Sequence, residues 1–168
     1  YYCIEDDFVY ELDTGWVVVK DSGATVAIVA DTIGGELAIT SAGTTDNDGG
    51  SVQGNEIFAV ATGKDMFFQT RIKNNDVDQS DICVGFTLNF VTNTENMLTA
   101  TDRIVFQVND GDASILCKTE KDGTETSTDS GIDMVDDTYV KLGISCSGTG
   151  TVEYFVNDKL VATHSTNI

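Results

Sequence analysis

The stretch Thr138–His164, TYVKLGISCSGTGTVEYFVNDKLVATH, decides the fold of this chain. Every second residue of Val140–Cys146 is apolar, and polar residues or glycine take the positions between them. This period of two is typical of a half-buried β-strand, because successive side chains of a strand point to opposite faces of the sheet. Val152–Val156 repeats the pattern. We therefore predict two strands, joined by a turn at Gly148-Thr149-Gly150.

A second turn is predicted at Asn157-Asp158, after which Leu160-Val161-Ala162 returns as a third strand. Two-residue hairpin turns of the primed types need positive φ angles, which Asn and Asp adopt more readily than most residues. The pattern explains every residue of this stretch as scaffold, and none of them is predicted to be catalytic.

Short apolar runs between polar residues fill the rest of the chain, which holds 16 glycines and no proline. No long segment has a helical period, so the sequence favours strands. Beyond the first stretch, strands are predicted at residues 15–20, 25–30, 36–40, 56–60, 65–73, 82–91, 103–109, 113–118 and 124–127. Roughly a dozen short strands with frequent turns predict an all-β fold, either a two-sheet antiparallel β-sandwich or a barrel. We expect one domain, residues 1–168, in which residues 1–14 form an N-terminal arm or an edge strand.

The alternation also predicts burial and position. Leu37 and Ile39 are expected to point inward, and Ile57 and Phe58 to be buried. Residues 65–73 and 82–91 are expected to be long central strands, since each shows an apolar face. Polar loops are predicted at residues 41–50, 74–81 and 130–137, of which 74–81 is expected to be acidic and solvated.

The charge balance is strongly acidic, with 28 Asp and Glu against 9 Lys and Arg and a net charge of −19. Phosphate backbones are bound by clustered Lys and Arg, so nucleic-acid binding is not expected. Anionic membrane surfaces are disfavoured for the same reason, and no apolar run is long enough to span a membrane. The acidic surface either keeps a β-protein soluble or docks on a basic partner. The chain starts at Tyr1 and not at Met, so we expect further residues upstream, among which an export signal is one option.

The four cysteines are Cys3, Cys83, Cys117 and Cys146, which lie far apart in the sequence. None forms a CxxC pair, so a zinc site has little support. Their density is also below that of a disulfide scaffold. We favour reduced thiols over disulfides, and expect Cys146 to act as a small core hydrophobe on the apolar face of its strand.

Residues for catalysis are sparse. Sandwich glycosidases place two acids on one face of a strand, whereas Glu36, Glu56 and Glu153 are isolated in the sequence. The single histidine, His164, has no nucleophile near it in the sequence, and a solvent-facing position at a strand end is favoured. We therefore predict no catalytic residues and no enzyme activity.

Metal and sugar sites are weighed against plainer interpretations. Asp46-Asn47-Asp48-Gly49 resembles the start of a calcium loop, but the twelfth position holds Ile57 where an EF-hand needs Glu. Asp110-Gly111-Asp112 and Asp136-Asp137 are favoured as β-turns over calcium ligands. Trp16 could stack on a sugar ring, although a core position is favoured for it. No metal or cofactor is predicted.

Several segments together resemble the concanavalin A-like (laminin-G-like) jelly rolls, in the version common among virion proteins of tailed phages. The resemblance covers residues 50–165 and is strongest at the end of the chain. The segments that carry it are Asp137–Gly143, Gly148–Asp158 and Val161–His164, with Glu56-Ile57-Phe58, Phe67–Lys73, Asp102-Arg103-Ile104 and Asn109–Asp112 before them. These are scaffold motifs, so the resemblance implies a jelly-roll sandwich more directly than it implies a function.

The resemblance implies a non-enzymatic virion structural protein that decorates or cements a capsid. Its location would be the capsid surface, after assembly in the host cytoplasm. The expected partners are the major capsid protein, other virion proteins and further copies of the chain. The alternative is a lectin-like carbohydrate-binding module of a tail fibre or secreted protein, with exposed aromatics on a sheet face and calcium in an Asp loop. Family members continue past the equivalent of Asn167-Ile168 to a last strand, which we expect to lie outside this sequence or to come from a neighbour.

Overall fold

A computed structural model describes residues 3–9, 12, 15–31, 33–43, 48–55, 57–88 and 96–168 of the chain, with the side chain of Asn96 left out. The chain forms two compact units. The smaller unit contains Tyr1–Ile57 and Asn89–Asn96, and the larger unit contains Phe58–Leu88 and Met97–Ile168. The strands pair in antiparallel fashion, which confirms the all-β prediction. The prediction of a single domain over residues 1–168, with an arm or edge strand at its start, stays a prediction.

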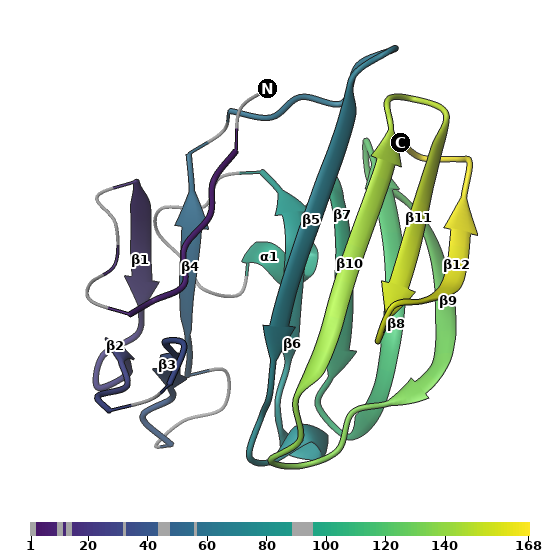
Figure 1. Cartoon of the computed structure of the whole chain (residues 1–168). Helices are drawn as coiled ribbons and strands as arrows, with labels where there is room; N and C mark the ends of the chain where they lie inside the picture. Colours follow the sequence, from purple (N-terminus) through teal and green to yellow (C-terminus); the bar gives the residue numbers. More distant parts are fainter. Residues whose placement is uncertain are drawn as a thin grey trace. The chain divides into compact units, whose positions relative to one another are not determined.

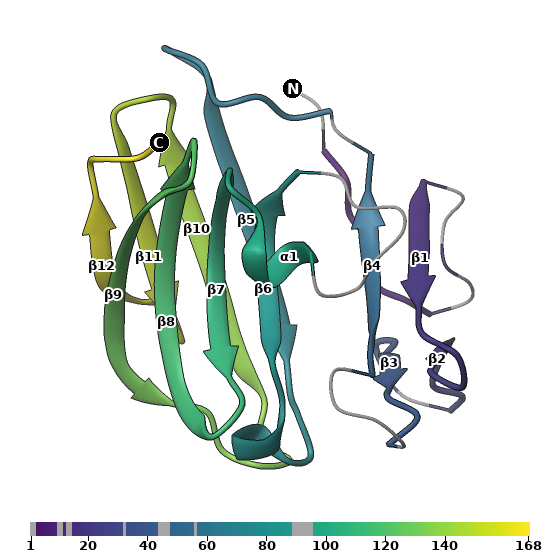
Figure 2. The same cartoon turned by 180° about the vertical axis from the view of Figure 1, so that it is seen from behind.

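The larger unit holds two four-stranded sheets, which lie one behind the other (Figures 1 and 2). The front sheet has the strand order β12-β11-β10-β5, and the back sheet has the order β6-β7-β8-β9. The strands of the front sheet are β5 (Asp65–Ile72), β10 (Val140–Ser147), β11 (Thr151–Val156) and β12 (Lys159–His164). Those of the back sheet are β6 (Ile82–Thr87), β7 (Arg103–Asn109), β8 (Asp112–Lys121) and β9 (Thr124–Asp133).

The two sheets share one hydrophobic core, which the alternating residues of Thr138–His164 help to build. The predicted apolar face of β10 is buried from Val140 to Cys146, and Tyr154 of β11 is fully buried. The Tyr154 ring meets that of Phe106 in the back sheet edge to face, with centroids 5.2 Å apart. Its hydroxyl donates a hydrogen bond to the carbonyl oxygen of Lys118, 2.6 Å away. The strand pattern predicted from this stretch is therefore confirmed.

The predicted turns are also confirmed. Asn157 and Asp158 have φ angles of 51° and 66°, the positive values that a primed hairpin turn requires. Gly148 has φ 55°. A Cβ atom at Gly148 would lie 2.7 Å from the carbonyl oxygen of Ala61, so a side chain does not fit at this position without a shift of the backbone.

The smaller unit holds two strand pairs, in which β1 (Trp16–Lys20) pairs with β4 (Gly50–Gly54) and β2 (Thr25–Ile28) pairs with β3 (Leu37–Thr40). The prediction of a strand at 56–60 is wrong: the strand lies at Gly50–Gly54. The glycines of this strand give no apolar signal, and a Cβ atom at Gly50 would come 3.0 Å from the Ile39 side chain, so a larger residue there would crowd Ile39. The inward positions predicted for Ile39, Ile57 and Phe58 are also wrong, because all three are exposed.

Three further predictions need correction in the larger unit. Strand β9 continues to Asp133, beyond the predicted end at residue 127, because Thr126, Thr128 and Ser130 take the inward positions that apolar residues fill elsewhere. Strands β5 and β6 are the outer strands of their sheets and not central ones. The loop at 74–81 contains a short 3₁₀ helix, η1 (Val77–Gln79), whose Val77 is buried.

The last residues of the chain cross from the front sheet to the back sheet. The Oγ1 atoms of Thr166 and Thr126 lie 2.9 Å apart, and the Asn167 amide donates to Thr126 Oγ1 at 2.8 Å. Lys121 Nζ donates to the carbonyl oxygen of Ile168 at 2.9 Å. These contacts join β12 to β9 at one edge of the sheet pair. The expectation of a further strand beyond Ile168 stays a prediction.

Candidate binding surface

The predicted solvent-facing position of His164 is wrong. Its side chain is 3% exposed and bridges the two sheets. Nδ1 lies 2.9 Å from Thr119 Oγ1 and Nε2 lies 3.0 Å from Thr128 Oγ1. Because the Thr119 hydroxyl donates its hydrogen to the carbonyl oxygen of Thr166, it accepts from His164, which places the imidazole hydrogen on Nδ1. Burial lowers the pKa of His164, so the neutral form is favoured.

Sequence reasoning missed this bridge, although a signal for it was present. His164 lies opposite Val152 in the register of β11 and β12, and Ala162 lies opposite Tyr154. The period of two therefore continues inward through Ala162 to His164. Both imidazole nitrogens contact threonine hydroxyls and the ring packs against Tyr154, with centroids 5.2 Å apart. These contacts indicate a structural role.

Three thiols and one tyrosine hydroxyl of the larger unit are poor nucleophiles. Burial raises the pKa of the Cys83 and Cys117 thiols to about 12, and that of Cys146 also rises. Burial likewise raises the pKa of Tyr154. All four cysteines are free thiols, and Cys146 lies on the apolar face of β10, as predicted. The thiolate is the reactive form of cysteine, so the three thiols with raised pKa values are inert near neutral pH.

A buried arginine organises the other side of the back sheet. Arg103 donates from Nε to Glu120 at 2.8 Å, and from Nη2 to Glu125 at 2.7 Å. Its Nη1 also donates to Gln107 and to the carbonyl oxygens of Met97 and Leu98 in the short helix α1 (Asn96–Thr99). The network ties α1 to the sheet, and its donors and acceptors satisfy one another. We therefore assign the Arg103 network a structural role.

The predicted turn carboxylates cap backbone groups. Asp112 accepts the N–H of Ser114 at 3.0 Å, and this bond lowers the pKa of Asp112. Asp136 accepts the N–H of Val77 at 2.9 Å. In the part of the chain that the structure describes, no three His, Cys, Asp or Glu side chains group together in a way that could hold a metal ion. Asp46 and Asn47 of the first candidate calcium loop lie outside the described residues, as does Glu56.

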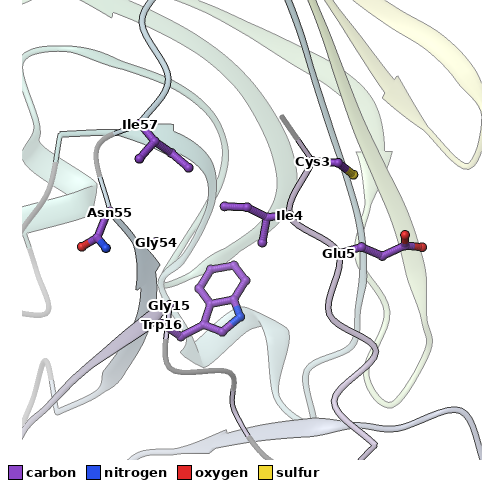
Figure 3. Close-up of a pocket in the computed structure, with 8 residues that line it drawn as sticks. All are labelled: Cys3, Ile4, Glu5, Gly15, Trp16, Gly54, Asn55 and Ile57. Atoms are coloured by element: carbon purple, nitrogen blue, oxygen red, sulfur yellow. The ribbon is translucent and has the colours of Figure 1, made fainter. Parts of the chain in front are cut away.

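Trp16 is half-buried and lines a small cavity of about 200 Å³ in the smaller unit (Figure 3). Its indole N–H donates to Asp6 at 2.8 Å. Figure 3 shows Ile4 and Ile57 on the side of the cavity toward the indole ring, whereas the carboxylate of Glu5 points away from it. The cavity also has Cys3, Gly15, Gly54 and Asn55 in its lining. Trp16 is thus held from one side and leaves part of its ring accessible.

The larger unit presents a second accessible surface, the outer face of the front sheet. We define this outer face by the residues that alternate with the core positions: Asp65, Phe67, Gln69, Arg71, Lys141, Gly143, Ser145, Ser147, Thr151, Glu153, Phe155, Leu160 and Thr163. Phe67 is 75% exposed and Leu160 is 47% exposed, while Phe155 is half-buried. Register places Gly143 between Gln69 and Phe155, so the middle of the face has no side chain standing above it.

Charges on the outer face are separated along the strands. Arg71 and Lys141 are cross-strand neighbours at one end of β5, and Asp65 lies at the other end. Arg71 stacks over the ring of Tyr139, with Cζ 4.3 Å from the centroid. Lys141 Nζ lies 2.6 Å from a carboxylate oxygen of Asp158. The face therefore runs from a cationic end, across a partly apolar middle, to an acidic end.

Neither helix of the described residues has the length and apolar character needed to cross a bilayer. Comparison with known proteins adds no relative: no family model, no curated protein and no solved structure matches this chain.

Proposed function

We propose that this chain is a non-enzymatic structural protein of a virion, of the capsid decoration or cement type. It would sit on the outer capsid surface with the major capsid protein or other virion proteins as partners, and it would act as an oligomer. The observation that carries the proposal is the outer face of the front sheet, where Phe67 stands 75% exposed on a sheet backed by a shared core. A large exposed aromatic on a rigid sheet is typical of a surface that binds protein.

The fold we propose for the larger unit is an antiparallel β-sandwich of the jelly-roll, concanavalin A-like type. Two four-stranded antiparallel sheets with one shared core support it. Buried polar groups tie the sheets together, since Tyr154 bonds Lys118, and His164 bonds Thr119 and Thr128. Such a plate resists local opening, which suits a protein that must hold its shape on a particle.

The role of the strong negative charge follows from the same proposal. With a net charge of −19, decorated particles would repel one another and remain dispersed. The loops and sheet edges would contact capsid subunits, and the outer face would join the chain to the next protein of the assembly.

Mass spectrometry of purified particles tests this function. The expected result is many copies of the chain per particle, released together with or before the major capsid protein as denaturant is raised. Absence of the chain from the particles, or one copy per particle, would rule out a decoration role. A matched binding experiment adds the chain to particles that lack it, and a shell that takes up no chain would count against the proposal.

The second candidate function is carbohydrate binding, and the accessible Trp16 ring beside a cavity of about 200 Å³ favours it. Aromatic rings bind sugars by stacking. A glycan array, read with and without a chelator, tests this alternative. Binding that is lost in Trp16→Ala and retained in Phe67→Ala would establish it, and silence on all glycans would remove it. Trp16→Phe keeps an aromatic ring and checks that loss in the alanine variant is not caused by unfolding.

A further inference from the structure

We propose that the outer face of the front sheet is self-complementary, and that it pairs face to face with the same face of a second copy. This inference rests on the proposed function, in which the outer face joins the chain to a neighbouring protein, and it names that neighbour. The copies would be related by a two-fold axis that lies parallel to the sheet and perpendicular to its strands. In such an isologous contact, residue i of one copy meets residue j of the other, and j meets i.

The charges of the outer face fit this axis. Phe68 and Ile144 are paired in register near the middle of β5 and β10. If the two-fold axis passes over this row, each residue of one copy faces the residue of the second copy that lies equally far from the row on its other side. Arg71, three residues beyond Phe68, then faces Asp65, three residues before it. Two-fold symmetry makes this pairing twice, so each copy offers a cation to an acid of the other.

The cationic row of the outer face has two charged residues, whereas the acidic row at the other end of β5 has one. The cationic row contains Arg71 and Lys141, which are directly opposite each other; Asp158 compensates the charge of Lys141, whereas Arg71 stacks over Tyr139. The acidic row contains Asp65 with Ser147 opposite it, and Lys64 precedes the strand at that end. A second copy that brings Asp65 to Arg71 would give this guanidinium a carboxylate partner, while Lys141 keeps Asp158. On a chain of net charge −19, an approach through this face also avoids the acidic remainder of the surface.

The same axis fixes what the outer-face aromatics meet: Phe155, one residue after Tyr154 of the central row, would face Glu153 of the second copy. Phe67 is next to the central row, so it would face Gln69 of the second copy and touch the Phe67 ring of that copy at a diagonal. Gly143 lies beside Gln69 and Phe155, and a Cβ atom there would lie 3.6 Å from Phe155 Cβ. The absence of a side chain at Gly143 leaves a shallow space that the opposing Phe67 could enter. Phe155 and Leu160 extend this apolar middle toward β12.

The size of the face sets the strength of the pairing. Strands lie about 4.8 Å apart and rise about 3.4 Å per residue, so four strands and the eight residues of β5 give a face of roughly 19 by 27 Å. Two copies would bury on the order of 1,000 Å² in total, which is the size of a weak, reversible interface. The dimer is therefore expected at high protein concentration or when a particle holds the copies close together.

Sedimentation equilibrium of the whole chain tests the proposal, at roughly 0.15 M salt, which screens the repulsion between two chains of net charge −19. A monomer–dimer equilibrium is expected. Phe67→Ser should raise the dissociation constant about tenfold or more, as loss of an interface anchor does. Val135→Ser is the matched control, since Val135 is 61% exposed in the loop before β10 and lies off the outer face. A wild-type chain that stays monomeric up to roughly 1 mM, a concentration that populates interfaces of this size, would overturn the proposal.

A charge swap gives the decisive readout. Arg71→Glu and Asp65→Arg should each raise the dissociation constant about tenfold, because each homodimer then sets like charges against each other twice. A mixture of the two variants should associate again, within about threefold of wild type, because both pairs in the mixed dimer are opposite in sign. Loss of the Arg71 contact with Tyr139, or partial unfolding, would not be repaired by mixing. A mixture that associates no better than its components would refute the axis.

These experiments distinguish a failure of the virion proposal from a failure of the self-pairing proposal. If particles carry many copies but the free chain never dimerises, the outer face binds another virion protein and the self-pairing is wrong. If the free chain dimerises but particles lack it, the virion role is wrong and the self-pairing stands.

Discussion

The single histidine offers a direct test of the contacts between the two sheets. His164 is neutral in the folded chain, and burial lowers its pKa below the ordinary value of 6.5. In the unfolded chain the same residue titrates near 6.5. As pH falls below that value, the unfolded state takes up a proton that the folded state does not. The free energy of unfolding should therefore decrease on acidification, until pH falls through the lowered pKa of the folded state.

The magnitude follows from proton linkage. Each pH unit between the two pKa values costs at most about 1.4 kcal/mol. From pH 7.5 to pH 5.5 the loss attributable to His164 should therefore be no more than about 1.4 kcal/mol, because the unfolded state is mostly uncharged over the first of these two units. For a chain of this length, that corresponds to a fall of roughly 3–5 °C in the melting temperature.

Urea denaturation of wild type and His164→Gln at several pH values measures the effect. The chain has one His, and ordinary Asp and Glu titrate near or below pH 4.3, so the difference between the two proteins isolates His164 in this window. The comparison also removes the general gain in stability that acidification gives to a chain of charge −19. An identical pH dependence in both proteins, or a wild-type curve that gains on the variant at low pH, would refute the bridge.

Three further predictions concern the core and the back sheet. Tyr154→Phe removes the hydroxyl that bonds Lys118 and should lower the free energy of unfolding by about 1 kcal/mol in urea titration, whereas no change would mean that the bond is not formed. Arg103→Ala should cost about 3 kcal/mol, because it leaves Glu120, whose side chain is 13% exposed, without its cation; a cost below about 1 kcal/mol would contradict the network. At pH 8, a maleimide followed by mass spectrometry should label the exposed Cys3 first, the half-buried Cys83 more slowly, and the buried Cys117 and Cys146 only after unfolding; fast labelling of Cys117 would contradict its burial and raised pKa.

Local pattern was sufficient for the strands β10 and β11 and for the turn that follows them. The apolar alternation in β10 and β11 predicted both the strands and their buried faces, because a period of two is a property of the chain alone. The turn at Asn157-Asp158 was equally readable, since positive φ depends on the residue itself. Such features need no knowledge of neighbouring strands.

Features that depend on a distant partner escaped prediction. Strand β4 begins and ends with glycine and packs closely against Ile39 at Gly50, and no local rule marks such residues as a strand. The polar strand β9 is held by β8 and by His164, so its Thr and Ser residues gave no apolar signal. Val77 of the acidic loop packs into the shared core, and its N–H donates to the carboxylate of Asp136, so both of its contacts come from residues far away in the sequence.

For the candidate surface, too, some features were predictable from the local sequence and others only from the paired strands. Alternation in β5 already set Phe67, Gln69 and Arg71 on the face away from the core, because side-chain direction along a strand follows from the order of residues. The neighbours of these residues depended on pairing in three dimensions: register brought Lys141 beside Arg71 and set Gly143 next to Gln69. Local order thus established which side chains face outward, whereas long-range strand pairing established which of them share a surface, because register is a relation between segments that no single segment contains.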